Sequence, residues 1–280
     1  MRTENLIIIG LAMVAVAFSA VAILRWGRLP IQASARSDNG IDSRWRYRLV
    51  GPLRSLGSVC SAGIICGVIV AGFLGRFVMR VLAATSGDGA QGLLTDADEV
   101  VGEITLDGTI GFIVFVGIGA GAITAIMLLI VRPWLHVSGA TAGVIAGLVP
   151  LALLGGSDFS SENRDFSILS PTWLAVGLIL SGTVLFGAAL GSVAARLQQT
   201  ANGDSRFRNL PILGVIPFVL VPPFLVGLVV YVVGRASLPG RLSAVLEQRT
   251  IQLVGRVLIA GLVGLLLFLT IRSSVDILSI

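Results

Sequence analysis

Lysine is absent from this 280-residue chain, and histidine occurs once. All 20 basic residues are arginine, which excludes a Schiff-base lysine and the phosphate-binding lysine of a P-loop. Because His136 is the only histidine, a His-rich metal site and an H-E-x-x-H zinc motif are also excluded. The G-x-S-x-G nucleophile motif is missing as well. We therefore expect a protein that is not an enzyme, with no catalytic residue, no metal site and no cofactor.

Charge of either sign is scarce. Charged residues make up 12% of the chain, about half the share of a soluble domain. Hydrophobic residues make up 55%, and the mean hydropathy is +0.95. This composition excludes a soluble globular enzyme, a disordered chain and a disulfide scaffold. It predicts a membrane protein that crosses the bilayer several times.

Only two cysteines occur, Cys60 and Cys66, and both lie within an apolar run. On one helix they would lie about 9 Å apart along the axis, which is too far for a disulfide. We interpret both as small buried side chains.

Seven apolar runs are long enough to cross a hydrocarbon core of about 30 Å, which needs about 20 residues. The runs are continuous rather than alternating, which predicts helices and not the strands of a barrel. We expect an all-α bundle that forms a single transmembrane domain over residues 1–280. Its predicted spans are residues 6–24, 56–75, 109–131, 137–154, 172–194, 212–233 and 251–271.

The segments between these spans differ in charge. One side of the predicted bundle holds 12 arginines and four acids, and the other holds eight arginines and 11 acids. Basic loops stay in the cytoplasm. We therefore expect a cytoplasmic basic loop at 25–55 and an external acidic segment at 85–108. The N-terminus is then outside and the C-terminus inside, in a multi-pass protein of the plasma (inner) membrane.

An alternative is that the first span is a cleaved signal peptide, since Ala20-Val21-Ala22 resembles a cleavage site. Translocation of the arginine-rich loop that follows would break the charge rule. We therefore expect an uncleaved helix.

The basic loop contains the sequence Trp45-Arg46-Tyr47-Arg48, in which arginine alternates with aromatic residues. This pattern is typical of the headgroup layer and predicts a short amphipathic piece there. The lipid bilayer is the expected partner, and a more specific alternative is binding of anionic lipid by the Arg25–Arg54 loop. Nucleic acid is not an expected partner.

The external segment from Leu93 to Asp107 reads LLTDADEVVGEITLD. Thr95 has the residue type of a helix N-cap. Three acids follow it in what would be the first turn, where the helix dipole favours negative charge. We expect a short helix on the outer surface before the third span.

Glycines spaced four residues apart recur in spans two to five. Such spacing puts them on one helix face and lets two backbones approach closely, which predicts a compact bundle. The repeats are Gly63/Gly67, Gly117/Gly121, Gly139/Gly143/Gly147 and Gly187/Gly191. The sixth predicted span contains Pro217, Pro222 and Pro223, which favour a kink.

Ionisable residues inside a span are candidates for function, and here they are arginines. Arg76 and Arg80 would share one helix face near the outer end of the second span. Arg256 is expected at a similar depth in the seventh. The arginines either pair with external acids or form an outward-facing site for an anion or a lipid headgroup. The candidate cluster is Arg76, Arg80, Arg256, Asp96, Asp98, Glu99, Glu103 and Asp107.

Three functions follow as hypotheses, and the third of them, after the two described next, is an intramembrane enzyme. The first is a non-enzymatic membrane protein that binds or moves a small anion or a lipid. The alternative is a structural or accessory subunit that docks a membrane partner, or a second copy, through its glycine-rich helix faces. His136 lies beside Trp134 and is interpreted as an interfacial residue at the inner membrane edge.

Overall fold

The computed structural model describes residues 3–31, 44–96, 99–103, 105–154, 163–202, 210–216 and 248–279. These residues form helices and no β-strand, so the all-α prediction is confirmed for this part of the chain. Five of the helices are long and apolar enough to cross a membrane. The predicted span 212–233 lies mostly outside the described residues, and the count of seven spans is not confirmed.

The helices follow one another along the chain with short 3₁₀ (η2, η4) and π-helical (η1, η3) pieces between them. In order they are α1 (Thr3–Trp26), α2 (Arg44–Cys66), η1 (Gly67–Leu74), α3 (Gly75–Thr85), η2 (Asp88–Ala90), α4 (Leu106–Phe112), η3 (Ile113–Ile118), α5 (Gly119–Val131), α6 (Gly139–Leu154), α7 (Arg164–Ile168), α8 (Thr172–Asn202), η4 (Leu210–Val215) and α12 (Arg249–Leu278).

Two long rods each contain a π-helical segment in the middle. One rod runs through α2, η1 and α3, and the other runs through α4, η3 and α5. The two π segments pack against each other. A π-helical turn widens the helix locally and is often found where a helix is strained or functional.

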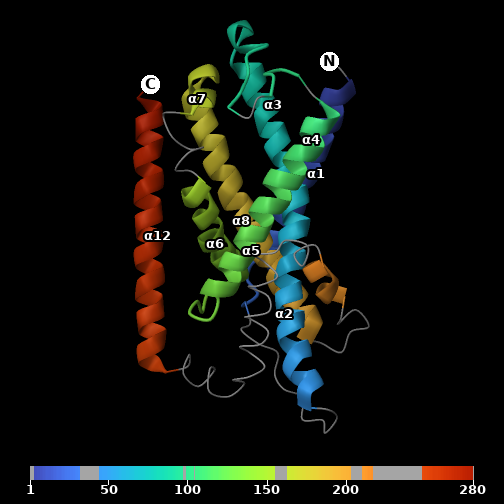
Figure 1. Ribbon diagram of the computed structural model, residues 1–280, viewed down its shortest axis with the longest axis vertical. Helices are drawn as coiled ribbons and strands as arrows, with labels where there is room; N and C mark the ends of the chain where they lie inside the picture. Colours follow the sequence, from blue (N-terminus) through green and yellow to red (C-terminus); the bar gives the residue numbers. More distant parts are fainter. Residues whose placement is uncertain are drawn as a thin grey trace.

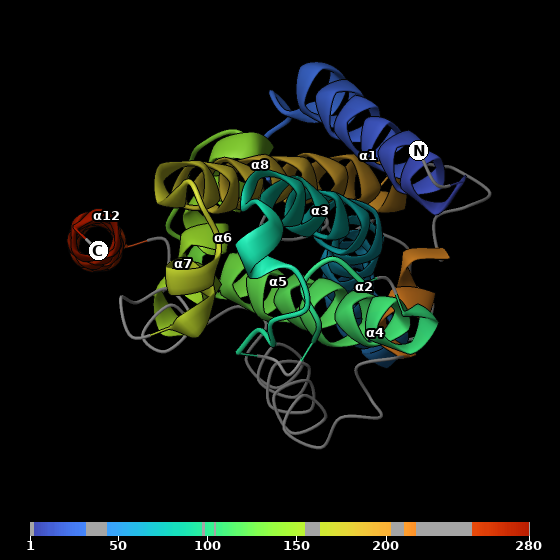
Figure 2. The same ribbon diagram turned by 90° about the horizontal axis from the view of Figure 1, so that it is seen from above.

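Helix α8 lies at the centre of the bundle (Figures 1 and 2). Helix α1 packs on one side of it, while α2 and α6 pack on the other side and in turn contact α5. Leu128, Leu190 and Val59 are among the fully buried side chains of this core. Both cysteines are buried and free, as predicted.

The glycine repeats meet one another at two antiparallel interfaces inside the bundle. One lies between the two rods, and the other lies between α6 and α8. Gly63 and Gly121 face each other, and a β-carbon at Gly63 would lie 2.6 Å from the carbonyl oxygen of Gly121. Gly139 faces Gly191 in the same way, because a β-carbon at Gly139 would lie 2.7 Å from the Gly191 carbonyl oxygen. Gly143 is likewise in contact with Gly187 across the α6–α8 interface. The close approach predicted from the spacing is therefore confirmed.

Helix α12 runs opposite to the predicted direction. Its first turns contact the connection between α5 and α6, and its last residues pack near α7, where Ile277 joins a cluster with Phe166 and Leu82. Both chain termini therefore lie at one end of the bundle (Figure 1). The expectation that the C-terminus lies opposite the N-terminus is not met. The reason is that α8 ends and α12 begins at the same end of the bundle, whereas the prediction placed the end of the fifth span and the start of the last span at opposite ends.

The segment from Leu93 to Asp107, which was predicted to be external, forms a hairpin-like loop in its described residues, so the predicted surface helix is wrong. The Val101 N–H donates to the Leu93 carbonyl at 2.9 Å, and the Gly92 N–H donates to the Val101 carbonyl at 3.1 Å. Gly92 and Gly102 have φ angles of 81° and 93°, which glycine adopts without strain. The Thr95 hydroxyl accepts from the Glu99 N–H at 3.1 Å, so it closes a turn rather than capping a helix.

The basic loop is described only at its edges, because residues 32–43 lie outside the described residues. Helix α2 begins at Arg44, so the Trp45-Arg46-Tyr47-Arg48 sequence is helical. Anionic lipid binding by this loop stays a prediction.

Candidate functional site

Arg76 is the second residue of α3, the helix that follows the π segment η1. Its guanidinium carbon lies 5.1 Å from the centroid of the Phe112 ring, which is a favourable cation–π distance. Its Nε is buried and has no hydrogen-bond partner among the described residues. No ion pair joins Arg76 to an acid within the described part of the chain, although the negative charge of Glu99 acts on it. The ring of Phe112 takes the place of the expected carboxylate.

Arg80 connects α3 to the hairpin-like loop. Its Nη1 donates to the Gly102 carbonyl at 2.9 Å, and Gly102 has the positive φ that ends the hairpin. This contact is structural, since it holds the loop against the end of the bundle.

The acids of the predicted cluster separate. The Glu99 carboxylate lies over the start of α4, where a β-carbon at Gly108 would meet its Oε2 at 2.8 Å. The Asp96 N–H donates to the Asp165 carboxylate at 2.8 Å. Glu103 and Asp107 are exposed, and Asp98 lies outside the described residues. The structure therefore brings Arg76, Arg80 and Glu99 to one end of the bundle, where Arg76 contacts the Phe112 ring and Arg80 binds the Gly102 carbonyl.

Arg256 lies at the opposite end, so its predicted place beside Arg76 and Arg80 is wrong. Its Nε donates to the Trp134 carbonyl at 3.3 Å, and its Nη2 lies 3.0 Å from Nδ1 of His136. Both partners lie in the connection that follows α5, at the end predicted to be cytoplasmic. The reversed direction of α12 moves Arg249 and Arg256 to this basic end, and it moves Arg272 and Asp276 away from it.

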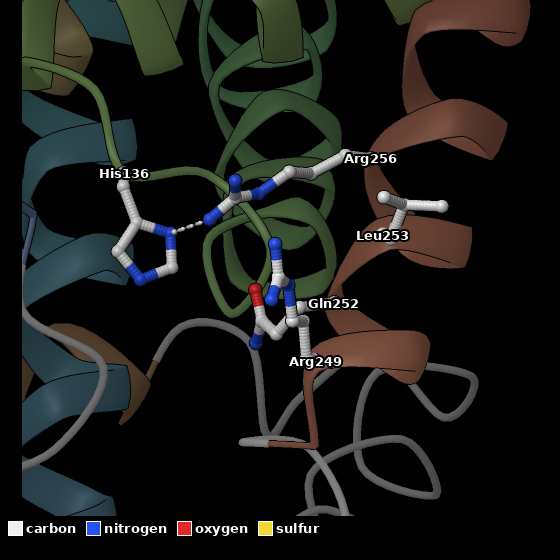
Figure 3. Close-up of a pocket in the computed structure, with 5 residues that line it drawn as sticks. All are labelled: His136, Arg249, Gln252, Leu253 and Arg256. Carbon is white, nitrogen blue, oxygen red and sulfur yellow. Dashed lines mark hydrogen bonds between the residues drawn. The ribbon is translucent and has the colours of Figure 1, made fainter.

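A cavity of about 460 Å³ separates the start of α12 from the α5–α6 connection (Figure 3). Arg249 and Arg256 extend into it from α12, and His136 faces them from the other wall. Its described lining contains three basic residues and no acid, and it comprises His136, Arg249, Gln252, Leu253 and Arg256.

Hydrogen bonds hold this site together. The Gln252 side-chain amide donates to the Pro133 carbonyl at 3.1 Å, next to the bond between Arg256 and the Trp134 carbonyl. A guanidinium has donors only, so in this contact Nδ1 of His136 is the acceptor, and Nε2 lies on the other side of the ring.

The position of Arg249 is electrostatically unfavourable. It is the first residue of α12, where the helix dipole places partial positive charge, and the first turn contains no acid. A helix built only for stability would carry Asp or Glu in this turn. Local departures from the stabilising pattern are characteristic of functional sites.

Gly255 allows α12 to approach the connection. The Trp134 ring occupies the space that a β-carbon at Gly255 would take. The Trp134 indole nitrogen is buried, and within the described residues it has no hydrogen-bond acceptor. Arg256 follows Gly255 by one residue, and His136 follows Trp134 by two. The close contact between Gly255 and Trp134 therefore fixes the position of Arg256 along α12 relative to His136.

The sequence interpretation did not include Arg249, Gln252 or His136 among its candidates. One signal was available, because Arg249, Gln252 and Arg256 are spaced three and four residues apart and so share a helix face. That these residues face His136 could not be read from the sequence, since it depends on the direction of α12. Comparisons with protein-family models, curated proteins and solved structures return no match to this chain.

Proposed function

We propose that the protein binds the phosphate group of an anionic lipid in the cavity between α12 and the α5–α6 connection. The observation that supports this is the convergence of Arg249, Arg256 and His136 on one cavity whose described lining has no carboxylate. Guanidinium groups bind phosphate through paired donors, and the positive end of α12 adds to the same field.

A lipid rather than a free anion is favoured by the surroundings of the cavity. Leu253 lines it and is 60% exposed, and the apolar surface of α12 continues from there along the membrane-spanning length. Trp134 and His136 have the character of headgroup-level residues. A headgroup phosphate among the arginines would leave its acyl chains lying against α12.

The alternative function, docking of a partner through glycine faces, receives less support. The glycine repeats of spans two to five are in contact with one another and are not free for a partner. An apolar groove of about 560 Å³ remains, with Ile23 of α1 on one wall and Gly177 and Ser181 of α8 on the other. Acyl chains fill such a groove as well as a partner helix does.

The test is lipid binding by the purified protein in a neutral detergent, followed by native mass spectrometry. We expect phosphatidylglycerol to bind and phosphatidylcholine to bind far more weakly. Each arginine near an anionic membrane surface contributes about 1 kcal/mol, so R249Q/R256Q should weaken phosphatidylglycerol binding roughly 30-fold. The matched control is R272Q, which changes an exposed arginine near the other end of the same helix.

The single variant R249Q guards against a folding defect, because the Arg249 side chain makes no hydrogen bond within the described part of the chain. It should weaken binding about fivefold without lowering the melting temperature. Equal binding of both lipids, or binding unchanged in both variants, would overturn the proposal. Stronger competition by inorganic phosphate than by the lipid would assign the site to a free anion instead.

A further inference from the structure

A second cavity lies on the other side of the α5–α6 connection. Its volume is about 440 Å³, and His136 lines it as well as the first cavity. Two further arginines contribute to it, one from the end of α1 and one from the end of α5. The lining comprises Arg28, Pro30, Ile31, Arg132, Pro133, Leu135, His136, Val137 and Ser138.

The two arginines of this second cavity differ in setting. Arg28 is exposed, directly after α1, whereas Arg132 is only 3% exposed. The Nη1 of Arg132 donates to the Ser55 hydroxyl at 2.6 Å, which positions the guanidinium in the cavity wall. A buried, positioned guanidinium together with an exposed one is suited to an anion that enters from the headgroup layer.

The connection between the cavities is held from both sides. The Gly139 N–H donates to the Leu29 carbonyl at 2.8 Å, and the Ala140 N–H donates to the Gly27 carbonyl at 3.2 Å. These bonds fix the residues around Arg28 relative to the start of α6. The bonds of Gln252 and Arg256 fix α12 on the opposite side. The separation of the two basic cavities is therefore set by the fold and not by mobile side chains alone.

We infer that the site recognises a lipid that carries two phosphate groups, with one phosphate in each cavity and His136 between them. This inference rests on the proposed function, since the first cavity must bind a headgroup phosphate. It adds a preference for lipids in which a short linker joins two phosphates. The second phosphate then binds at a high effective concentration, which increases affinity without a new kind of contact.

The test compares cardiolipin, which has two phosphates, with phosphatidylglycerol, which has one, at equal phosphate concentration in vesicles containing the full-length protein. We expect the wild-type protein to prefer cardiolipin by about tenfold or more per phosphate. In R28Q this preference should fall to about twofold or less while phosphatidylglycerol binding is kept, because the first cavity is intact. The control R272Q should retain the full preference.

The outcomes separate the inference from the proposed function. Equal binding of the two lipids per phosphate, with R249Q still weakening both, would overturn the two-phosphate inference and leave the proposed function standing. Loss of all selectivity for anionic over neutral lipid would overturn both. Displacement of cardiolipin by inorganic pyrophosphate at the same phosphate concentration would overturn the assignment to a lipid. A full cardiolipin preference in R28Q would show that the second cavity plays no part.

Discussion

At the scale of single residues, the arginines of this chain have different roles that follow from what each contacts. Arg76 lies over an aromatic ring, Arg80 binds a backbone carbonyl, and Arg256 binds a carbonyl and an imidazole. Arginine suits all three environments because its charge is delocalised over a planar group with five donors. Lysine has a compact, strongly hydrated charge that makes neither the stacking nor the forked contacts equally well.

Replacement of Arg80 by glutamine tests the contact that holds the hairpin-like loop. A hydrogen bond from a charged donor contributes about 1.5–3 kcal/mol, and an exposed contact such as this one contributes about 1 kcal/mol. We expect R80Q to accelerate amide hydrogen exchange in residues 92–103 about fivefold. The control is R164Q, an exposed arginine of α7 at the same end of the bundle. Unchanged exchange in R80Q would show that the hairpin is held by its own turns.

At the scale of helices, the bundle is organised by backbone contacts between glycines rather than by large side chains. Lipid tails are as apolar as leucine, so burial from water does not drive helices together inside a membrane. Close van der Waals contact takes over this role, and it requires residues without a β-carbon. The pair Gly63–Gly121 therefore holds the two rods together, and the pair Gly143–Gly187 holds α6 against α8.

Substitution of Gly143 by alanine tests this organisation. Alanine favours a helix by about 1 kcal/mol over glycine, so a solvated or lipid-facing position should become more stable. At Gly143 the added methyl group meets the backbone of α8, and overpacking of this kind costs about 1–3 kcal/mol. We expect a lower melting temperature in detergent for G143A and no decrease for G177A, where the space around the glycine is open. Equal melting temperatures of G143A and G177A would show that α6 and α8 accommodate the added methyl group without a loss of stability.

At the scale of the whole molecule, the observed direction of α12 agrees with the distribution of arginine better than the predicted direction did. With α12 reversed, Arg249 and Arg256 lie at the end that already carries Arg28 and Arg132. The excess of arginine at this end is the feature that the charge rule associates with the cytoplasm. The cytoplasmic assignment of this end stays a prediction.

Reporter fusions measure the arrangement directly. We expect a fusion joined after Ala201 to read cytoplasmic and a fusion joined after Leu278 to read external, because α8 and α12 end at opposite ends of the bundle (Figure 1). A fusion after Arg36 serves as a reference for the basic side. Identical readings after Ala201 and Leu278 would contradict the direction of α12 and, with it, the contact between Arg256 and His136.

Composition and local spacing were sufficient for the all-helical character of the described residues, five long apolar helices and the glycine interfaces. These features depend on properties that each segment carries within itself: length, apolarity and the period of small residues. The burial of Cys60 and Cys66 belongs to the same class, since it follows from the apolar run around them.

The candidate site depends on contacts between segments that are far apart in the sequence. Only the tertiary structure determines these contacts. His136 and Arg256 are 120 residues apart, and their contact exists only because α12 begins at the end where α5 finishes. The helix predicted in the segment from Leu93 to Asp107 is wrong for a similar reason. Positive φ at Gly92 and Gly102, together with the Arg80 contact, outweighed the helix-capping potential of Thr95. Local patterns determine which segments are helices, whereas the direction of a helix is set by what its two ends contact.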